Sequence, residues 1–201
     1  MLSRKVIMHN TPIRSFKSST LLVATSLVCC AGLGTVAQAS YPADPSGPPP
    51  LQGPGKACVV IRHSAVLHAG HIGWGVEIAQ GRYMFGAVED MSSNGSKGWS
   101  QEGTWDDMLA AFQHPGHTGG RYDAIKCIEV AQPNPATAIN VGSTMPERSK
   151  HYNVFTKNCL HATYAVIHAY GATHVPTPSW ADMVPNKYYN DFKGHETPLH
   201  R

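Results

Sequence analysis

The chain has 201 residues, of which 42% are hydrophobic and 14% are charged. It is therefore long enough for one domain with its own core, and it is neither a coiled coil nor a wholly disordered chain. Four of its 16 Lys and Arg residues, and none of its 13 Asp and Glu residues, lie in residues 1–39. The remainder carries a formal charge of −1, which predicts no nucleic-acid partner.

Residues 1–39 have the three parts of a secretory signal peptide. A basic stretch ends at Lys17, an apolar run extends from Leu21 to about Val36, and Ala37-Gln38-Ala39 is a small-residue cleavage site. A membrane anchor is the alternative, but the run is shorter than the ~20 residues that span a bilayer. The sequence therefore predicts a secreted or cell-envelope protein with no stable membrane span once this leader is removed.

Three cysteines follow the leader, which is an odd number for an exported protein. Cys58 and Cys127 each lie in a strand-like run. They can form a disulfide if the two strands are neighbours, and otherwise they are two buried thiols, so both readings stay open. In the first case, Cys159 is the free thiol of the mature chain.

The segments after the leader change from turn-rich to strand-like. Residues 40–55 are rich in Pro and Gly, which predicts an extended linker, so the domain is expected to occupy 56–201. A short apolar run with β-branched residues predicts a strand over 57–62. A hairpin follows, with strands expected over 71–78 and 82–89.

The middle of the domain is expected to be loop, helix and strand in turn. Residues 92–103 are polar and predict a loop. The sequence Thr104-Trp-Asp-Asp107 has a hydroxyl residue followed by two acidic residues. This pattern predicts that Thr104 is the N-cap of a short helix that ends near Gln113. Residues 122–130 alternate as a strand does, and Asn134-Pro135 opens a helix-compatible stretch.

A further helix is predicted from Cys159 to Tyr170, with Asn158 as its N-cap and Gly171 as its C-terminal stop. The positions on one face of this helix are mostly small or apolar. This face is therefore expected to pack against the core. The proline-containing segment that follows is expected to wrap around the same domain and not to form a second one.

The first turn of this helix is where the sequence predicts a nucleophile. Unpaired backbone N–H groups and the helix dipole favour the thiolate form of Cys159 there. A thiolate beside an imidazole is an effective nucleophile. His71 is the preferred base, because it begins a strand on which two glycines share its face and leave room for a substrate. His63 and His68 are the alternative bases.

The register of the hairpin selects a third residue. If Ala79-Gln80-Gly81 is a three-residue loop with its glycine in the left-handed conformation, Glu89 faces His71 across the two strands. Directly opposed Cβ atoms are ~5 Å apart, which lets a carboxylate orient an imidazole. A two-residue loop would instead place Asp90 opposite His71.

The order of these pieces resembles that of the permuted papain-like group. This group includes lecithin:retinol acyltransferase-like proteins and rearranged relatives of the NlpC-type cell-wall peptidases. The matching pieces are the strand start His71-Ile-Gly73 and the helix start Asn158-Cys-Leu-His161, and the resemblance covers about residues 58–171. It implies an α+β, papain-like (circularly permuted NlpC-type) fold, in which the helix that carries the cysteine packs on an antiparallel sheet.

The resemblance also implies that Cys159 is the nucleophile and His71 the base. One feature departs from the acyltransferase members, which carry a second histidine on the next strand. Residues 82–89 contain none, so the third role passes to an acid, for which Glu89 is the candidate, or is empty.

These features predict a secreted cysteine hydrolase or acyltransferase that acts on amide or ester bonds, without a cofactor. Its partner would be a peptide-like or acyl substrate, with cell-wall peptides as one candidate. One alternative is a non-catalytic secreted binding or effector module of the same fold. Another is a metal-binding protein, since eleven histidines follow the leader. No Cys-x-x-Cys or His-Glu-x-x-His pattern accompanies them, so no metal site is predicted. His161 is expected to point away from Cys159.

The secreted protein is expected to begin at Ser40, because the small residues of Ala37-Gln38-Ala39 form the cleavage site. N-terminal sequencing or intact-mass measurement of the secreted material tests this expectation. A secreted form that retains Met1 or Met8 would contradict it.

Overall fold

The structure, a computed structural model, describes residues 48–89, 97–114, 121–151, 153, 158–179 and 184–199. The predicted signal peptide and residues 40–47 of the predicted linker lie outside the described residues. Every element named below belongs to the unit Ser40–Arg201.

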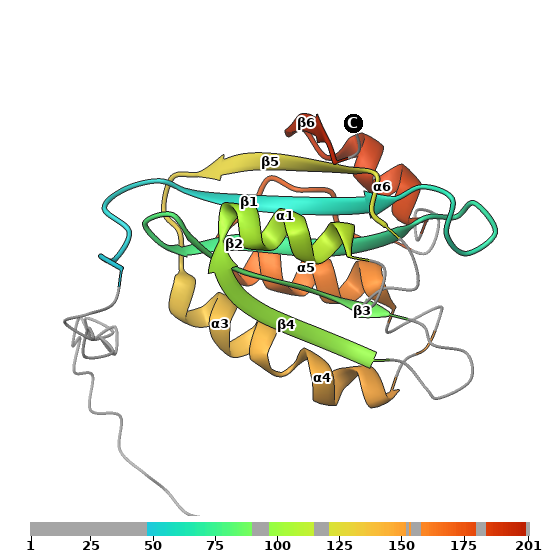
Figure 1. The fold of residues 1–201 in the computed structure, drawn as a ribbon, viewed down its shortest axis with the longest axis horizontal. Helices are drawn as coiled ribbons and strands as arrows, with labels where there is room; N and C mark the ends of the chain where they lie inside the picture. The colour runs from blue at the N-terminus through green and yellow to red at the C-terminus, as the bar shows by residue number, and fades with distance from the viewer. Residues whose placement is uncertain are drawn as a thin grey trace, which may run out of the picture. The chain divides into compact units, whose positions relative to one another are not determined.

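Six strands form one antiparallel sheet in the order β4-β3-β2-β1-β5-β6 (Figure 1). The strands are Gly55–Arg62 (β1), His71–Ala79 (β2), Arg82–Glu89 (β3), Lys97–Thr104 (β4), Ala124–Val130 (β5) and His195–Pro198 (β6). The predicted α+β class and the antiparallel sheet are therefore confirmed.

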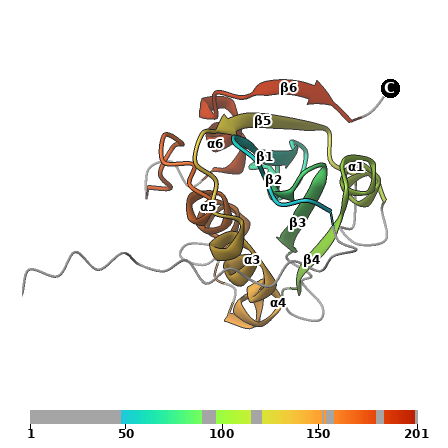
Figure 2. The same cartoon turned by 90° about the vertical axis from the view of Figure 1, so that its left-hand side faces the viewer.

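Helices cover both faces of the sheet. Figure 2 shows α1 on one face, and α3 and α5 on the other. The helices are Trp105–Gln113 (α1), Pro135–Ser143 (α3), Met145–Arg148 (α4), the 3₁₀ turn Ser149–His151 (η1), Cys159–Ala169 (α5) and Pro185–Asp191 (α6). None of the helices in the described ranges is long and apolar enough to cross a membrane.

Strand β1 lies inside the sheet and separates two hydrophobic cores. Ala57, Val59 and Ile61 belong to the core on the α5 side, whereas Cys58 and Val60 belong to the core on the α1 side. All five side chains are fully buried. The near-continuous apolar run of the sequence is therefore explained by burial on both faces. The strand begins at Gly55, so the last residue of the predicted linker is part of the domain.

The predicted disulfide is confirmed. Cys58 of β1 and Cys127 of β5 are paired residues on neighbouring strands, with Cα atoms 4.1 Å apart, and their sulfur atoms are bonded. The bridge joins positions separated by 69 residues, and closing so long a loop restricts the unfolded chain. Cys159 is the free cysteine of the described residues, as predicted.

The β2–β3 hairpin has the predicted register but not the predicted turn. Ala79 pairs with Arg82, so the loop has two residues and not three. The register then shifts between Glu77 and Ala79, and this irregularity restores the predicted pairing along the rest of the hairpin. His71 at the start of β2 and Glu89 at the end of β3 therefore lie at the same end of the sheet.

The predicted loop over residues 92–103 is wrong from residue 97 onward, where β4 begins. This strand pairs with β3 along its whole length. It is the outermost strand on its side of the sheet, so one of its edges has no strand partner. Gln101 and Glu102 are exposed, as expected for an edge strand. The polar composition of β4 does not indicate a strand, because the strand forms by pairing with β3 and not through local propensity.

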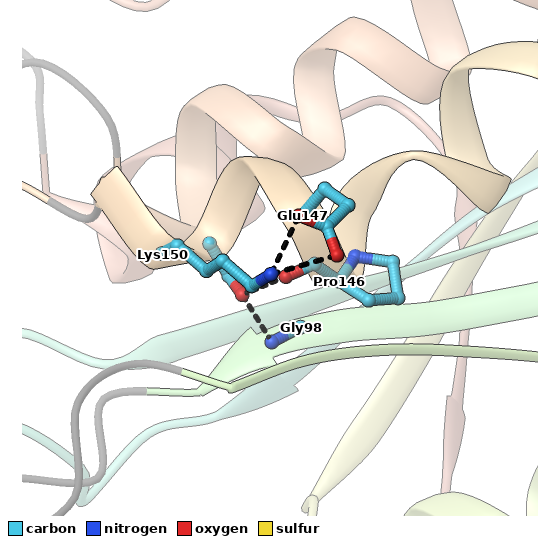
Figure 3. A network of polar contacts seen from close by, with 5 residues as sticks. Gly98, Pro146, Glu147 and Lys150 are labelled. Atoms are coloured by element: carbon cyan, nitrogen blue, oxygen red, sulfur yellow. Dashed lines mark hydrogen bonds and ion pairs between the residues drawn. The ribbon is translucent and has the colours of Figure 1, made fainter.

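The beginning of β4 is held by the turn that joins α4 and η1 (Figure 3). The backbone N–H of Gly98 donates to Oγ of Ser149 over 2.7 Å, and this hydroxyl donates to the carbonyl oxygen of Pro146 over 2.8 Å. A Cβ atom at Gly98 would collide with the carbonyl group of Met145, so only glycine allows this close approach. The contact fixes β4 next to Trp99.

The predicted helices are largely confirmed. Thr104 forms a capping box with Asp107 at the start of α1, and Asn134 caps α3. In α5, the side chains of the predicted face from Cys159 to Tyr170 are mostly buried, and the left-handed Gly171 (φ +107°) follows its end. These caps are local signals, which is why the sequence reveals them.

The segment after α5 contains two regular elements that the sequence does not predict. Helix α6 contacts β1 and β2 and buries Tyr188 and Tyr189. Strand β6 pairs with β5 and extends the sheet, although its four residues are exposed. Such a short, polar edge strand has no apolar alternation from which to predict it.

Ser149→Ala is expected to lower the free energy of unfolding by about 1 kcal/mol, because it leaves the partly buried N–H of Gly98 without its acceptor. Ser143→Ala is the matched control, since that hydroxyl donates to Asn140 on an exposed helix end. Denaturant unfolding measures both changes. Equal losses in the two variants would contradict the role given to Ser149.

Candidate active site

Three predicted site residues come from three elements and meet at one end of the sheet. His71 is the first residue of β2, Glu89 is the last of β3, and Cys159 is the first of α5. Their exposed fractions are 2%, 2% and 4%. At such burial, polar groups require partners inside the protein.

The start of α5 leaves backbone donors beside the sulfur atom. The side chain of Asn158 accepts the N–H of His161 over 3.1 Å, as an N-cap does. The first helical hydrogen bond runs from Ala162 to the carbonyl of Asn158. The N–H groups of Cys159 and Leu160 therefore precede the helical ladder, and they add positive potential at the thiol.

His71 and Glu89 form an ion pair, with 2.6 Å between Nε2 of the ring and Oε2 of the carboxylate. Two lone pairs would repel at this distance, so one of the two atoms carries a proton. The contact is electrostatic more than directional, because the ring N–H is not well aligned with the oxygen. The proximity of these two side chains is what the hairpin register predicts.

His71 also interacts with Cys159. Burial lowers the pKa of His71, but the charge of the Cys159 thiolate and a hydrogen bond with it, together with the hydrogen bond and charge of Glu89, raise the pKa to about 10. Since Nε2 faces Glu89, the ring nitrogen left for the sulfur is Nδ1. The ring is therefore an imidazolium at neutral pH, between the sulfur of Cys159 and the carboxylate of Glu89.

Two residues that sequence reasoning missed hold the other oxygen of Glu89. The hydroxyl of Tyr122 donates to Oε1 over 3.0 Å, and the indole N–H of Trp99 donates to the same oxygen over 3.3 Å. Tyr122 is fully buried, and its ring centroid lies 5.8 Å from that of His71. Burial and then the charge of Glu89 raise the pKa of Tyr122 well above its ordinary value, so it remains a hydrogen-bond donor.

No local signal identifies these two donors. Trp99 lies in the segment predicted to be a loop, and Tyr122 lies just before β5. Neither is near Glu89 in the sequence, and only the pairing of β4 with β3 brings Trp99 close to it.

The alternative bases lie in the segment between β1 and β2. His63 and His68 are both exposed. Asn186 holds this segment: its Oδ1 lies 2.9 Å from Nδ1 of His63, and its Nδ2 donates to the carbonyl oxygen of His68 over 2.9 Å. Asp90, the alternative acid, lies outside the described residues.

His161 does not take part in the ion pair. Its Nδ1 lies 2.9 Å from Oδ1 of Asn158, and burial lowers its pKa. Within the ranges that the structure describes, no group of three or more His, Cys, Asp or Glu side chains could hold a metal ion.

Comparisons with known proteins give one likeness in fold. No family model matches the chain, and no curated protein matches its sequence. Among solved structures, the crystal structure of the type VI secretion system effector TseH matches with a TM-score of 0.48 and 11% sequence identity. The match covers 69% of this chain and 90% of that chain.

His71 is expected to stay protonated at pH 8 and to titrate near pH 10, whereas an ordinary histidine titrates near 6.5. Because its pKa is raised, the ion pair stabilises the fold fully below pH 6.5, and this stabilisation is lost as the pH rises through about 10. Nuclear magnetic resonance of the ring carbons against pH measures the midpoint. Cys159→Ser should lower it, since it removes the thiolate. A wild-type midpoint near 6.5 would contradict the arrangement.

Proposed function

We propose that this chain is a secreted, papain-like thiol enzyme that cleaves or transfers acyl groups at amide or ester bonds. The observation that carries the proposal is the buried ion pair of His71 and Glu89 beside Cys159, which is near enough to raise the pKa of His71. A nucleophile, a base and an orienting acid in this order are the requirements of covalent acyl transfer.

The reaction begins when the sulfur of Cys159 attacks the carbonyl carbon of the substrate. The carbonyl oxygen gains negative charge, which the backbone N–H groups at the start of α5 can stabilise. His71 then gives its Nδ1 proton to the departing amine or alcohol, which leaves a thioester on Cys159. In the second step, His71 takes a proton from water or from an acceptor hydroxyl or amine. This nucleophile breaks the thioester and restores the thiol.

Two features favour a substrate outside the cytosol. The disulfide between Cys58 and Cys127 is of the kind that persists in oxidising compartments. The leader predicted over residues 1–39 would direct the chain there. Peptide-like amides, with cell-wall peptides first among them, are therefore the substrates to test before lipid esters.

Cys159→Ser is expected to abolish turnover and to leave the fold unchanged, because a hydroxyl replaces the thiol atom for atom but is a far weaker nucleophile here. His71→Ala is expected to reduce turnover by at least ~100-fold through loss of the base. Mass spectrometry of cell-wall peptides and of peptide esters after incubation measures the products. His161→Ala is the matched control, since this histidine lies two residues from Cys159 but outside the ion pair.

Iodoacetamide alkylation tests the nucleophile without a known substrate. At pH 6, Cys159 should react at least ~10-fold faster in the wild type than in His71→Ala, because the imidazolium favours the thiolate. Equal rates in the two proteins would overturn the proposal. The chain would then be a binding module with the shape of an enzyme.

A further inference from the structure

The two oxygens of Glu89 have different partners. Oε1 accepts two hydrogen bonds, from the Tyr122 hydroxyl and the Trp99 indole, and Oε2 faces Nε2 of His71. The Tyr122 hydroxyl can donate or accept, but the indole N–H of Trp99 can only donate. The atom at the Oε1 position must therefore be an acceptor.

This constraint fixes which nitrogen of His71 carries a proton. Two hydrogen bonds to Oε1 stabilise the ionised form of Glu89, so Oε2 faces the ring as an acceptor and the ring carries the proton on Nε2. A neutral ring with its proton on Nε2 has a lone pair on Nδ1, which can take the proton of the Cys159 thiol. The other neutral form, with the proton on Nδ1, cannot.

We propose that Tyr122 and Trp99 are positioning residues that act through Glu89 to keep the proton of His71 on Nε2 and to direct Nδ1 at Cys159 as a base. This inference rests on the proposed function. It adds the two donors that set the proton state of the site.

The two donors are held by different parts of the fold. The backbone N–H of Tyr122 donates to the carbonyl oxygen of Phe112 at the end of α1 over 3.1 Å. The Phe112 ring lies 4.9 Å from the Tyr122 ring and 5.4 Å from the Trp99 ring. Trp99 itself is carried by β4, next to Gly98 and the turn of Figure 3. One buried phenylalanine thus supports both rings, and neither donor can turn away without repacking this core.

Glu89→Gln separates a positioning role from a structural one. The amide has one acceptor and one donor group, and the two donors require its oxygen at the Oε1 position. The NH₂ group then faces Nε2 of His71, where two N–H groups would clash. The ring must lose the Nε2 proton and become neutral, with its remaining proton on Nδ1. Turnover should fall by about 10²–10⁴-fold, as expected when a base is held in the wrong tautomer, and alkylation at pH 6 should fall at least ~10-fold, as in His71→Ala.

Nitrogen-15 resonances of the His71 ring report this change directly. The wild type should show protons on both ring nitrogens at neutral pH, and Glu89→Gln should show one proton, on Nδ1. A protonated Nε2 in Glu89→Gln would overturn the proposal. This measurement needs no substrate and only one isosteric substitution, so it separates the proposal from the proposed function: the tautomer can change whether or not Cys159 is a nucleophile.

Removing the two donors should rescue the amide. When Glu89→Gln is combined with Tyr122→Phe and Trp99→Phe, the amide can turn and offer its oxygen to His71. The proton should return to Nε2, and alkylation should recover at least ~10-fold over Glu89→Gln alone. The proposal would be overturned if Glu89→Gln lowers the alkylation rate equally with and without the two donors, in variants whose circular dichroism is native. Tyr83→Phe in the Glu89→Gln protein is the matched control, because Tyr83 is a buried tyrosine of the same core and should give no rescue.

Discussion

A buried carboxylate beside a buried imidazole is the interaction on which the arrangement of this end of the domain depends. Placing Glu89 at 2% exposure removes a charge from water, which is costly unless the charge is paired and hydrogen bonded. Three groups meet this need: the ring of His71, the hydroxyl of Tyr122 and the indole of Trp99. Removal of any one weakens the pairing of this buried carboxylate, so the four side chains form one unit.

The backbone provides this unit through strand register. Glu89 can contact His71 only in this register of the hairpin. The irregularity between Glu77 and Ala79 maintains the register despite a two-residue turn. A slip of one residue would turn every side chain of β3 to the opposite face of the sheet. The alternation that buries both cores therefore also selects the residue that faces the imidazole.

The parts of the site that the sequence reveals are those with local signals. Asn158 before Cys159 marks a helix start, and the alternation of the hairpin places Glu89 near His71, although the sequence does not reveal the two-residue turn and the irregularity that together give this register. The rest depends on contacts between distant segments. Strand β4 is polar and contains glycines, and it is ordered by β3 and by the turn at Ser149. The partners of Glu89 on Oε1 follow from that packing, and no spacing in the sequence predicts them.

The position of Tyr122 connects the site to both ends of the described domain. The next residue, Asp123, donates its N–H to the carbonyl of Ile61 in β1 and accepts the N–H of Leu199, which follows β6. Its carboxylate also accepts the N–H of His63. Segments more than 130 residues apart thus converge beside the donor that holds Glu89. These contacts therefore tie the segment that carries Tyr122 to β1 and to the residue that follows β6.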